Sequence, residues 1–287
     1  MLSNEPTLIR ISQGQLNVLE RCPRQFQNTY LEQLYSPIDP EQEKRQILGS
    51  RFHLIMQQIS MGLPIDSFLK TNTQIQTWIE TFVAAAPEII DSRNKPLKDI
   101  SNHSNYCAIA VEEQQNFRES EHYRTLQVKN YLLTVIYDLL IADSSQAQIV
   151  DWKTYPKPPT KRKLEANWQT RLYLYLLAQT SNYPPENISM TYWFFPVQGK
   201  LESIKFNYNS LWHQQTAKKL ERLLNQLTKF LNSYHQGESF PQVAEGKKVC
   251  NFCQYATRCG RQNQADQKLE ADRSAAMNLA IIEEVSL

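Results

Sequence analysis

The segment YLLTVIYDLLIADSSQAQIVDWKTY, residues 131–155, is the most informative part of this chain. It contains two strand-length apolar runs separated by a polar turn, a pattern typical of an antiparallel β-hairpin. If the turn is symmetric about Ser144 and Ser145, Asp138 on the first strand lies directly opposite Asp151 on the second. The Cβ atoms of directly opposed residues are about 5 Å apart. The hairpin is therefore expected to bring two carboxylates together.

Two carboxylates at this distance repel each other, and burying an isolated charge among apolar residues is costly. A divalent cation relieves the repulsion, and Mg²⁺ or Mn²⁺ binds carboxylate and phosphate oxygens while keeping water ligands. Because side chains alternate along a strand, Lys153 lies on the same face as Asp151. Its ammonium group is suited to positioning a water or stabilising charge on a phosphate. The alternative is a structural salt bridge between Asp138 and Lys153.

The rest of the chain predicts one mixed sheet covered by helices. Ser12 is expected to cap the first helix and Pro23 to kink it. Helical patterns are expected over residues 15–34, 41–59, 66–90, 164–179 and 210–235, with a final helical tail after residue 262. Strands are expected over residues 106–117, 126–142, 148–154, 188–197 and 201–208, with polar turns over 118–123 and 143–146.

Composition limits the class of protein. The 287 residues are 41% hydrophobic and 21% charged, and the mean hydropathy is -0.53, which is enough apolar material for a sizeable core. No window of about 18 uncharged apolar residues is present, so a membrane span is excluded. The first residues lack the pattern of a signal peptide, and a cytoplasmic location is expected. The net charge of +2 neither requires nor excludes a nucleic-acid partner.

The spacing of Asp138, Asp151, Trp152 and Lys153 resembles the PD-(D/E)XK nuclease superfamily. It is most similar to the RecB-like branch, which includes the iron–sulfur exonucleases of CRISPR adaptation. The resemblance covers residues 12–260. It implies an α/β fold with a restriction-endonuclease-like mixed central sheet flanked by helices, a helical N-terminal region and a C-terminal loop stapled by a metal cluster. It also implies a metal-dependent exonuclease acting on single-stranded DNA, in repair, recombination or CRISPR-type DNA processing.

The same resemblance assigns further site residues. His53, within GSRFHLIMQQ, matches a helical histidine that binds the metal, so the implied Mg²⁺ or Mn²⁺ ligands are His53, Asp138, Asp151 and the Trp152 carbonyl. Gln169 and Tyr173, one turn apart within WQTRLYLYLLAQ, match residues that orient the lysine strand and contact nucleic acid. The implied catalytic residues are Asp138, Asp151, Lys153, Gln169 and Tyr173. Without the resemblance, a lone helical histidine such as His53 is usually structural, and the alternative for Tyr173 is a core residue.

Two details of the resemblance stay open. Glu112 or Glu113, on the first expected strand, is a candidate further acidic residue, and a solvated strand end is the alternative. Val135 stands where the family often has glycine, three residues before Asp138. This departure is expected to narrow the space for substrate near the metal without removing a ligand.

Cys250, Cys253 and Cys259 lie within ten residues of one another. In a reducing compartment this spacing indicates metal ligands, and zinc and iron–sulfur clusters normally take four. Cys22 is the better fourth candidate, because Cys107 lies among apolar strand residues and is expected to be a small buried hydrophobe. The resemblance implies that Cys22, Cys250, Cys253 and Cys259 bind a 4Fe–4S cluster. Structural zinc is the rival, and a cysteine set without metal is the remaining alternative.

Basic residues follow the lysine strand directly in KTYPKPPTKRK, residues 153–163. They are expected to bind phosphates without sequence preference, and a solvated loop is the alternative. They are Lys157, Lys161, Arg162 and Lys163. Tyr155 and Trp168 are expected to stack on unpaired bases. Arg24, Gln25 and Tyr30 are further candidates for contact, with an ordinary amphipathic helix as the alternative.

Four regions are expected along the chain: an N-terminal helical region at 1–105, a nuclease core at 106–240, a cysteine-cluster loop at 241–263 and a helical tail at 264–287. DNA is the expected partner, with a helicase or integrase-type protein as a second one. Two other functions remain open. The chain could be a non-catalytic DNA-binding or scaffold subunit of a helicase–nuclease or integrase complex, or a zinc-stapled interaction protein.

Overall fold

The computed structural model describes residues 8–35, 40–70, 72–91, 117–154, 157–196 and 199–261. The chain divides into two compact units, each built from two separate stretches. Unit 1 contains Met1–Asn17 and Ile38–Leu224, and unit 2 contains Val18–Pro37 and Asn225–Leu287. This grouping differs from the four contiguous regions expected from the sequence, which stay a prediction. In the part of the chain that is described, no helix has the length and apolarity needed to cross a membrane.

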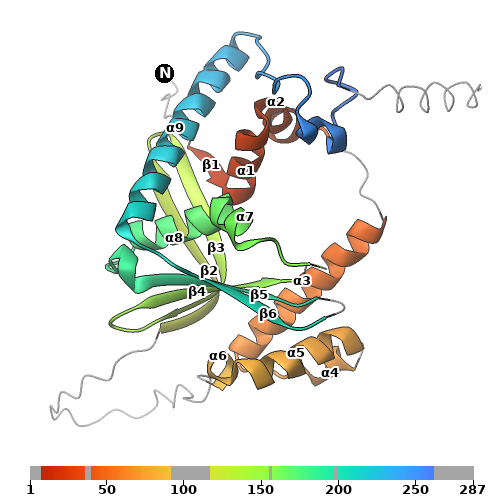
Figure 1. Cartoon of the computed structure of the whole chain (residues 1–287), viewed down its shortest axis with the longest axis vertical. Helices are drawn as coiled ribbons and strands as arrows, with labels where there is room; N and C mark the ends of the chain where they lie inside the picture. The colour runs from red at the N-terminus through yellow and green to blue at the C-terminus, as the bar shows by residue number, and fades with distance from the viewer. Residues whose placement is uncertain are drawn as a thin grey trace, which may run out of the picture. The chain divides into compact units, whose positions relative to one another are not determined.

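The helices and strands are labelled in Figure 1. The α-helices are α1 (Gln13–Arg21), α2 (Pro23–Phe26), α3 (Pro40–Ser60), α4 (Asp66–Leu69), α5 (Thr73–Ala85), α6 (Pro87–Asp91), α7 (Lys161–Ala166), α8 (Trp168–Gln179) and α9 (Ser210–His235). Shorter helical turns are η1 (Gln27–Leu31), η2 (Pro185–Asn187) and η3 (Lys248–Phe252). The strands are β1 (Ile9–Ser12), β2 (Phe117–Val128), β3 (Tyr131–Ala142), β4 (Ala147–Lys153), β5 (Ile188–Phe194) and β6 (Glu202–Asn207).

All six strands form one mixed sheet in unit 1. The strand order is β1-β3-β4-β5-β6, and β2 pairs with the other edge of β3. Strands β1 and β3, and β4 and β5, are parallel, whereas the β2–β3, β3–β4 and β5–β6 pairs are antiparallel. This sheet with its flanking helices confirms the expected α/β fold class.

The β3–β4 hairpin has the register that the symmetric turn predicts. Its ladder runs from Leu139 opposite Val150 to the turn, and one further step places Asp138 opposite Asp151. Asp143 forms the turn itself, because its Oδ1 accepts hydrogen bonds from the backbone N–H groups of Ser145 and Gln146 at 2.7 and 2.9 Å. Two carboxylates therefore come from neighbouring strands, one from β3 and one from β4.

The prediction of a turn at residues 118–123 is wrong. This segment belongs to strand β2, in which the chain is extended from Phe117 to Val128. Its residues alternate between exposed and half-buried, as in a strand with one solvated face. The actual turn lies at Lys129 and Asn130, where Lys129 has a φ of 55°, so the expected strand at 126–142 is two strands. Residues 118–122 are all polar or charged, as in a loop, and neither residue of the actual turn is glycine or proline. The expected strand at 106–116 lies outside the described residues.

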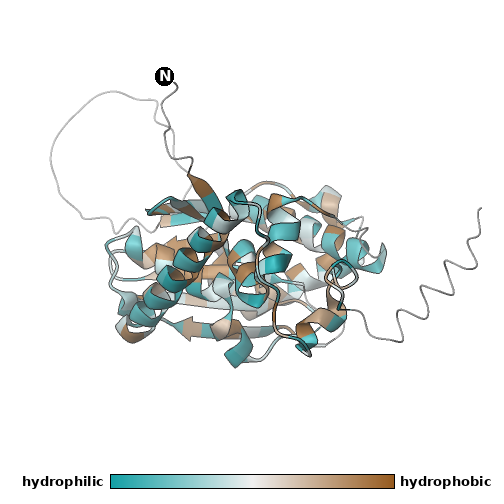
Figure 2. Ribbon diagram, turned by 90° about the horizontal axis from the view of Figure 1, so that it is seen from above, coloured by the Kyte–Doolittle hydropathy of each residue, from teal (hydrophilic) through white to brown (hydrophobic). Residues whose placement is uncertain are grey.

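Side-chain caps explain where several helices begin. Ser12 and Gln15 form a capping box, with the Ser12 N–H donating to Gln15 Oε1 at 2.8 Å and the Gln15 N–H to Ser12 Oγ at 3.5 Å. Asn72 accepts from the Ile75 N–H at the start of α5, and Asn167 accepts from the Gln169 N–H at the start of α8. These caps divide the helical patterns expected at 66–90 and 164–179 into separate helices. Helix α9 has the predicted bounds. Figure 2 shows that the helices carry both hydrophilic and hydrophobic residues.

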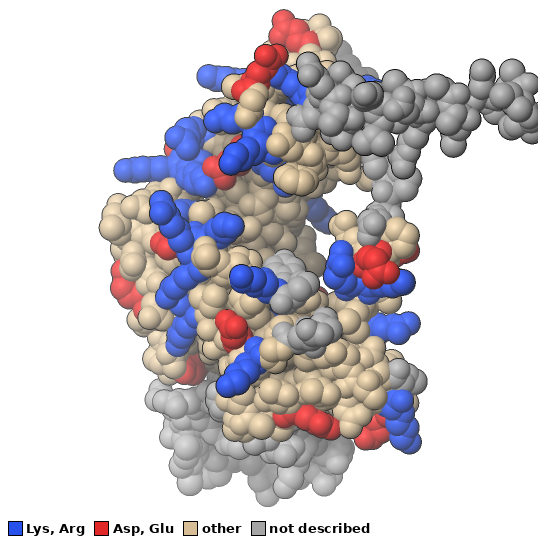
Figure 3. All heavy atoms as spheres, turned by 45° about the vertical axis from the view of Figure 1, so that its right-hand side comes forward, with Lys and Arg blue, Asp and Glu red and all other residues tan. Residues whose placement is uncertain are grey.

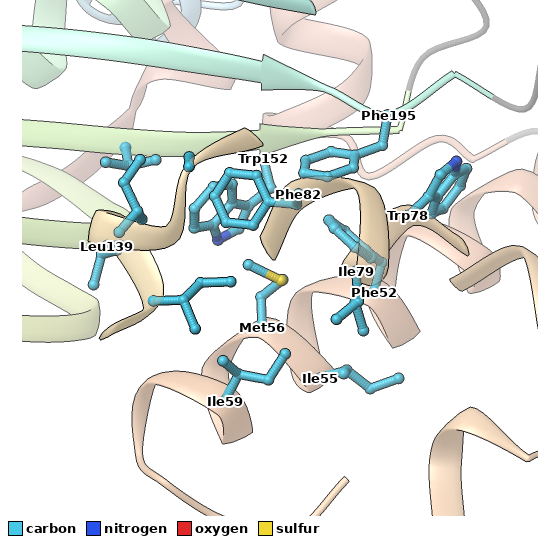
Figure 4. Close-up of a cluster of buried hydrophobic side chains, with 14 of the residues drawn as sticks. Phe52, Ile55, Met56, Ile59, Trp78, Ile79, Phe82, Leu139, Trp152 and Phe195 are labelled. Atoms are coloured by element: carbon cyan, nitrogen blue, oxygen red, sulfur yellow. The ribbon is translucent and has the colours of Figure 1, made fainter. Parts of the chain in front are cut away.

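A cluster of buried apolar side chains, the helix-layer cluster, joins α3, α5 and α6 to the sheet (Figure 4). From the sheet side it includes Leu139, Val150, Trp152 and Phe195. Phe52 on α3 contacts Phe195, with ring centroids 4.5 Å apart. The residue after Phe52 is His53, so this cluster also determines where His53 lies.

Unit 2 joins its two stretches around Phe240. The Phe240 N–H donates to Gln27 Oε1 at 2.6 Å, and Arg24 Nε donates to the Phe240 carbonyl at 2.6 Å. The rings of Phe26 and Phe240 are stacked, with centroids 6.2 Å apart. Arg24, a candidate for nucleic-acid contact, therefore has a structural role in unit 2.

Candidate active site

A cleft of about 550 Å³ opens in unit 1 between α3, the β2–β3 pair and α8. It is lined by Gly49, Ser50, His53, Leu54, Gln57, Glu121, Ile136, Asp138 and Tyr173. A Cβ at Gly49 would lie 3.0 Å from Thr154 Oγ1, so the absence of a side chain lets α3 approach the end of β4. Val135 is buried and does not line the cleft, so it does not narrow the cleft as expected.

Three potential metal ligands meet in this cleft. Donor atoms of His53, Glu121 and Asp138 all lie within 4.8 Å of one another. His53 Nδ1 is 3.5 Å from Asp138 Oδ1. Burial alone lowers the pKa of His53, but the hydrogen bond to Asp138 and the negative charges of Asp138 and Asp151 outweigh it and hold that pKa above its usual value. Burial and the charge of Asp138 raise the pKa of Glu121.

Asp138 also links the two strands of the hairpin. Its Oδ2 accepts a hydrogen bond from the Trp152 backbone N–H at 2.7 Å. This bond fixes the carboxylate at the point where the β3–β4 ladder ends. The Trp152 indole is buried in the helix-layer cluster.

Asp151 lies next to this group and is fully buried. It forms an ion pair with Lys153, and its Oδ1 accepts a hydrogen bond from Gln169 Nε2 at 2.7 Å. Burial raises the pKa of Asp151, and the ammonium group of Lys153 opposes that rise. The lysine thus pairs with Asp151, not with Asp138 as in the salt bridge considered from the sequence. Gln169 on α8 positions the carboxylate of β4.

Tyr173 lines the cleft although only 3% of it is exposed. Its hydroxyl lies 3.4 Å from Gln13 Nε2, and its backbone carbonyl accepts a hydrogen bond from the Tyr137 hydroxyl at 3.0 Å. Burial and the charges of Asp151 and Asp138 raise the pKa of Tyr173, so the phenol is neutral at ordinary pH. A neutral hydroxyl beside the carboxylates can donate a hydrogen bond.

Glu121 is the site residue that sequence reasoning missed, because its segment was interpreted as a turn. It lies on β2 at the position that faces Asp138 in the strand register. The signal available in the sequence was that residues 118–123 contain neither glycine nor proline, the residues that most often mark a turn. The acids considered instead, Glu112 and Glu113, lie outside the described residues.

The donor set of the cleft fits a hard divalent cation. It offers two carboxylates and one imidazole, which are ligands of Mg²⁺ or Mn²⁺. Two carboxylates this close to each other also need positive charge nearby. Among the described residues, no other group of three or more His, Cys, Asp or Glu side chains has its donor atoms within 4.8 Å of one another.

The four cysteines singled out in the sequence surround one small cavity in unit 2. Cys22 comes from the first stretch of the unit, and Cys250, Cys253 and Cys259 come from the second. Burial and the neighbouring thiols raise the pKa of Cys250 and of Cys259. Metal ions and iron–sulfur clusters bind cysteines as thiolates, and a bound cation would offset the repulsion between neighbouring thiolates. These four cysteines are therefore candidate ligands of one metal group. Cys107 lies outside the described residues.

The basic residues after β4 are exposed, as expected for Lys157, Lys161, Arg162 and Lys163. Trp168 is different, because it is fully buried and Lys219 Nζ lies 5.0 Å from its ring centroid. The prediction that Trp168 stacks on bases is therefore wrong, and the apolar spacing of α8 explains its burial. Tyr155 lies outside the described residues. Figure 3 shows several Lys and Arg side chains close together on the surface.

Comparison with known proteins agrees with this geometry. The family model of the PD-(D/E)XK nuclease superfamily matches residues 10–260. The chain therefore belongs to the PD-(D/E)XK nuclease superfamily, whose members use divalent metals.

Two solved structures are similar at low sequence identity. One is a protein from Eubacterium rectale provisionally described as an exonuclease, with 12% identity, a TM-score of 0.46, and coverage of 87% of this chain and 90% of that chain. The other is the protein SSO0001, with 14% identity, a TM-score of 0.40, and coverage of 92% of this chain and 90% of that chain. Among curated proteins, none matches this chain.

Proposed function

We propose that this protein is a divalent-metal-dependent deoxyribonuclease that degrades single-stranded DNA from an end. The observation that carries the proposal is the cleft in which His53, Glu121 and Asp138 meet beside the Asp151–Lys153 pair. Carboxylates next to a lysine suit hydrolysis of a phosphodiester, because the reaction needs both a held water and positive charge near the phosphate. Membership of a nuclease superfamily supports the reaction class.

The ligands of Mg²⁺ or Mn²⁺ in this proposal are His53, Asp138, Asp151 and the carbonyl of Trp152. When bound, the cation neutralises charge on the phosphate and makes a nearby water more acidic. The Nζ of Lys153 donates a hydrogen bond to the attacking water and stabilises the developing negative charge. Gln169 keeps Asp151 oriented through its 2.7 Å hydrogen bond. The neutral hydroxyl of Tyr173 donates a hydrogen bond to the substrate phosphate.

The surface next to the site supports a nucleic-acid substrate. The exposed basic residues of 157–163 follow β4, the strand that carries Asp151 and Lys153. Such residues contact phosphates of any sequence, so binding should weaken as salt concentration rises. DNA repair, recombination or CRISPR-type DNA processing, a helicase or integrase-type partner and a cytoplasmic location remain predictions.

The test is cleavage of end-labelled linear and of circular single-stranded DNA in Mn²⁺ by the full chain. The proposal expects degradation of the linear DNA only. It expects Asp151→Ala and Lys153→Ala to lower the rate by about 10²-fold or more, since each removes a group that acts on the reacting phosphate. Lys205→Ala, on the exposed part of β6, is the matched control and should retain the wild-type rate.

Each other outcome overturns a defined part of the proposal. Cleavage of the circle would replace exonuclease with endonuclease activity. No cleavage by folded, metal-loaded protein would replace the enzyme with a non-catalytic DNA-binding or scaffold subunit. Equal loss of activity in Lys205→Ala would mean that the effect of Lys153→Ala is not specific to the site.

We further propose that Cys22, Cys250, Cys253 and Cys259 bind a 4Fe–4S cluster that holds the two stretches of unit 2 together. Cys22 from the first stretch and the three cysteines of the second stretch line one small cavity, which supports a single shared metal group. The resemblance of the cysteine spacing to that of iron–sulfur exonucleases favours a cluster over zinc.

Metal analysis of anaerobically purified protein tests the cluster. The proposal expects brown protein that contains iron, with both lost in Cys22→Ser. Colourless protein with stoichiometric zinc would replace the cluster with a zinc site and favour the zinc-stapled alternative. The nuclease proposal is independent of this result, because it depends on the cleft of unit 1.

A further inference from the structure

Glu121 has a backbone conformation that glutamate rarely adopts. Its φ is 52°, in the left-handed region, although it lies inside strand β2. The register with β3 is unchanged on both sides, because Ser120 pairs with Leu139 and His122 pairs with Tyr137. No extra residue is inserted, so this is not a β-bulge. The unusual backbone angle is confined to Glu121, the residue opposite Asp138.

The carboxylate of Glu121 points to the cleft with His53 and Asp138, and the three donor atoms lie within 4.8 Å of one another. Two features of this placement are unfavourable. A non-glycine residue in the left-handed region destabilises the fold. A carboxylate this close to another carboxylate adds electrostatic repulsion, which contributes to the raised pKa of Glu121. Lys153 does not compensate for this repulsion, because it is paired with Asp151.

We propose that Glu121 is an additional ligand of the divalent cation in the cleft, contributed by β2. A cation among His53, Glu121 and Asp138 would turn the repulsion between the two carboxylates into attraction to a shared charge. The left-handed conformation directs the Glu121 carboxylate to that position without shifting the strand register. The inference rests on the proposed function for the presence of the cation, and it assigns one more hard oxygen ligand, which favours Mg²⁺ or Mn²⁺ over softer metals.

The test measures Mn²⁺ affinity by calorimetric titration of the full chain, and the thermal unfolding midpoint in the presence of chelator. Glu121→Gln should weaken Mn²⁺ binding by about tenfold or more, since even residues that only support a ligand contribute that much. Glu119→Gln makes the same chemical change two residues earlier on β2 and should bind Mn²⁺ as wild type does.

The glycine variants separate backbone strain from metal binding. Glu121→Gly should raise the midpoint in chelator by about 1–3 °C, because glycine tolerates a positive φ and the repulsion with Asp138 is gone. Lys129→Gly is the matched control, since Lys129 has a φ of 55° in the turn of the same hairpin. The unfolding midpoint of Lys129→Gly in chelator should not fall below that of wild type. Of the two glycine variants, only Glu121→Gly should bind Mn²⁺ more weakly.

Two results would overturn the inference. In the first, Glu121→Gln binds Mn²⁺ as tightly as Glu119→Gln does. In the second, Glu121→Gly unfolds at a lower temperature than wild type in chelator. Failure of the proposed function gives a different pattern, in which wild type and Asp138→Asn both show no Mn²⁺ binding and no DNA cleavage.

Discussion

Phe82→Ala is expected to loosen the attachment of the helical layer to the sheet. Phe82 on α5 is fully buried. Its ring centroid is 5.2 Å from Trp152, 5.1 Å from Trp193 and 5.6 Å from Phe195, and each pair is packed edge to face. Figure 4 shows Phe82 beside Trp152 and Phe195. One side chain thus contacts β4, β5 and the residue that follows β5.

The expected cost can be worked out from these contacts. Replacing a buried phenylalanine by alanine costs about 3–5 kcal/mol, and each well-oriented aromatic pair adds about 0.5–1.5 kcal/mol beyond burial of area. With three such pairs, we expect the upper part of the range, about 4–5 kcal/mol. Native proteins have a total stability of about 5–15 kcal/mol. The variant should therefore lose about a quarter or more of its stability.

The assay is urea unfolding followed by tryptophan fluorescence, with Mn²⁺ affinity measured on the same samples. Because Phe52 belongs to the same cluster and precedes His53, the variant should also bind Mn²⁺ more weakly. Val83→Ala is the matched control, since Val83 is the next residue and is 41% exposed, and it should cost less than about 0.5 kcal/mol. If Phe82→Ala lowers the free energy of unfolding no more than Val83→Ala does, then Phe82 does not attach the helical layer to the sheet.

Four other outcomes are expected. Asn167→Ala should destabilise the protein by about 1 kcal/mol in thermal unfolding, because it removes the cap of α8, and should lower DNase activity through Gln169; unchanged values in both assays would contradict this. Hydrogen bonds from Ser145 and Gln146 lower the pKa of Asp143 to about 2, so its stabilising effect is present above about pH 4 and is lost as the pH falls toward 2. Asp143→Ala should lack this acid-dependent loss in a series of unfolding midpoints, and an unchanged pH profile would count against it. Gly49→Val should lower the cleavage rate, since its side chain would push α3 away from β4, and a wild-type rate would show that the approach is not needed. Removal of divalent cations with EDTA should abolish cleavage and Mn²⁺ should restore it; activity that survives EDTA would exclude the metal mechanism.

The core of the site could be predicted because it is encoded locally. In the β3–β4 hairpin, a polar turn between two apolar runs determines the register, and the observed pair of Leu139 and Val150 agrees with it. Strand β5 and helix α9 were predicted for the same reason, since each has an uninterrupted periodic pattern. Asp138, Asp151 and Lys153 followed from side-chain alternation along these strands.

Other parts depend on long-range contacts or on single backbone angles. Strand β1 has four residues and is extended because Ile9–Ser12 pairs in parallel with β3, more than a hundred residues later. The left-handed φ of Glu121 has no signature in the sequence, because glutamate has no preference for that region. Trp168 was misassigned because an aromatic residue near lysines has the same local pattern whether it is buried or available for stacking.

Unit 2 is built from two stretches that lie far apart in the sequence, and this has a consequence for the order of events during protein synthesis. Cys22 belongs to a stretch made early, and the three other cysteines around its cavity follow roughly 230 residues later. At about 5–20 residues per second, the ribosome needs roughly 10–50 s to synthesise the intervening chain. During that time the Cys22 thiol has none of these partners, and the stretch around Phe26 has no Phe240 to pack against. Unit 2 can therefore be completed only in chains that have been translated through Cys259.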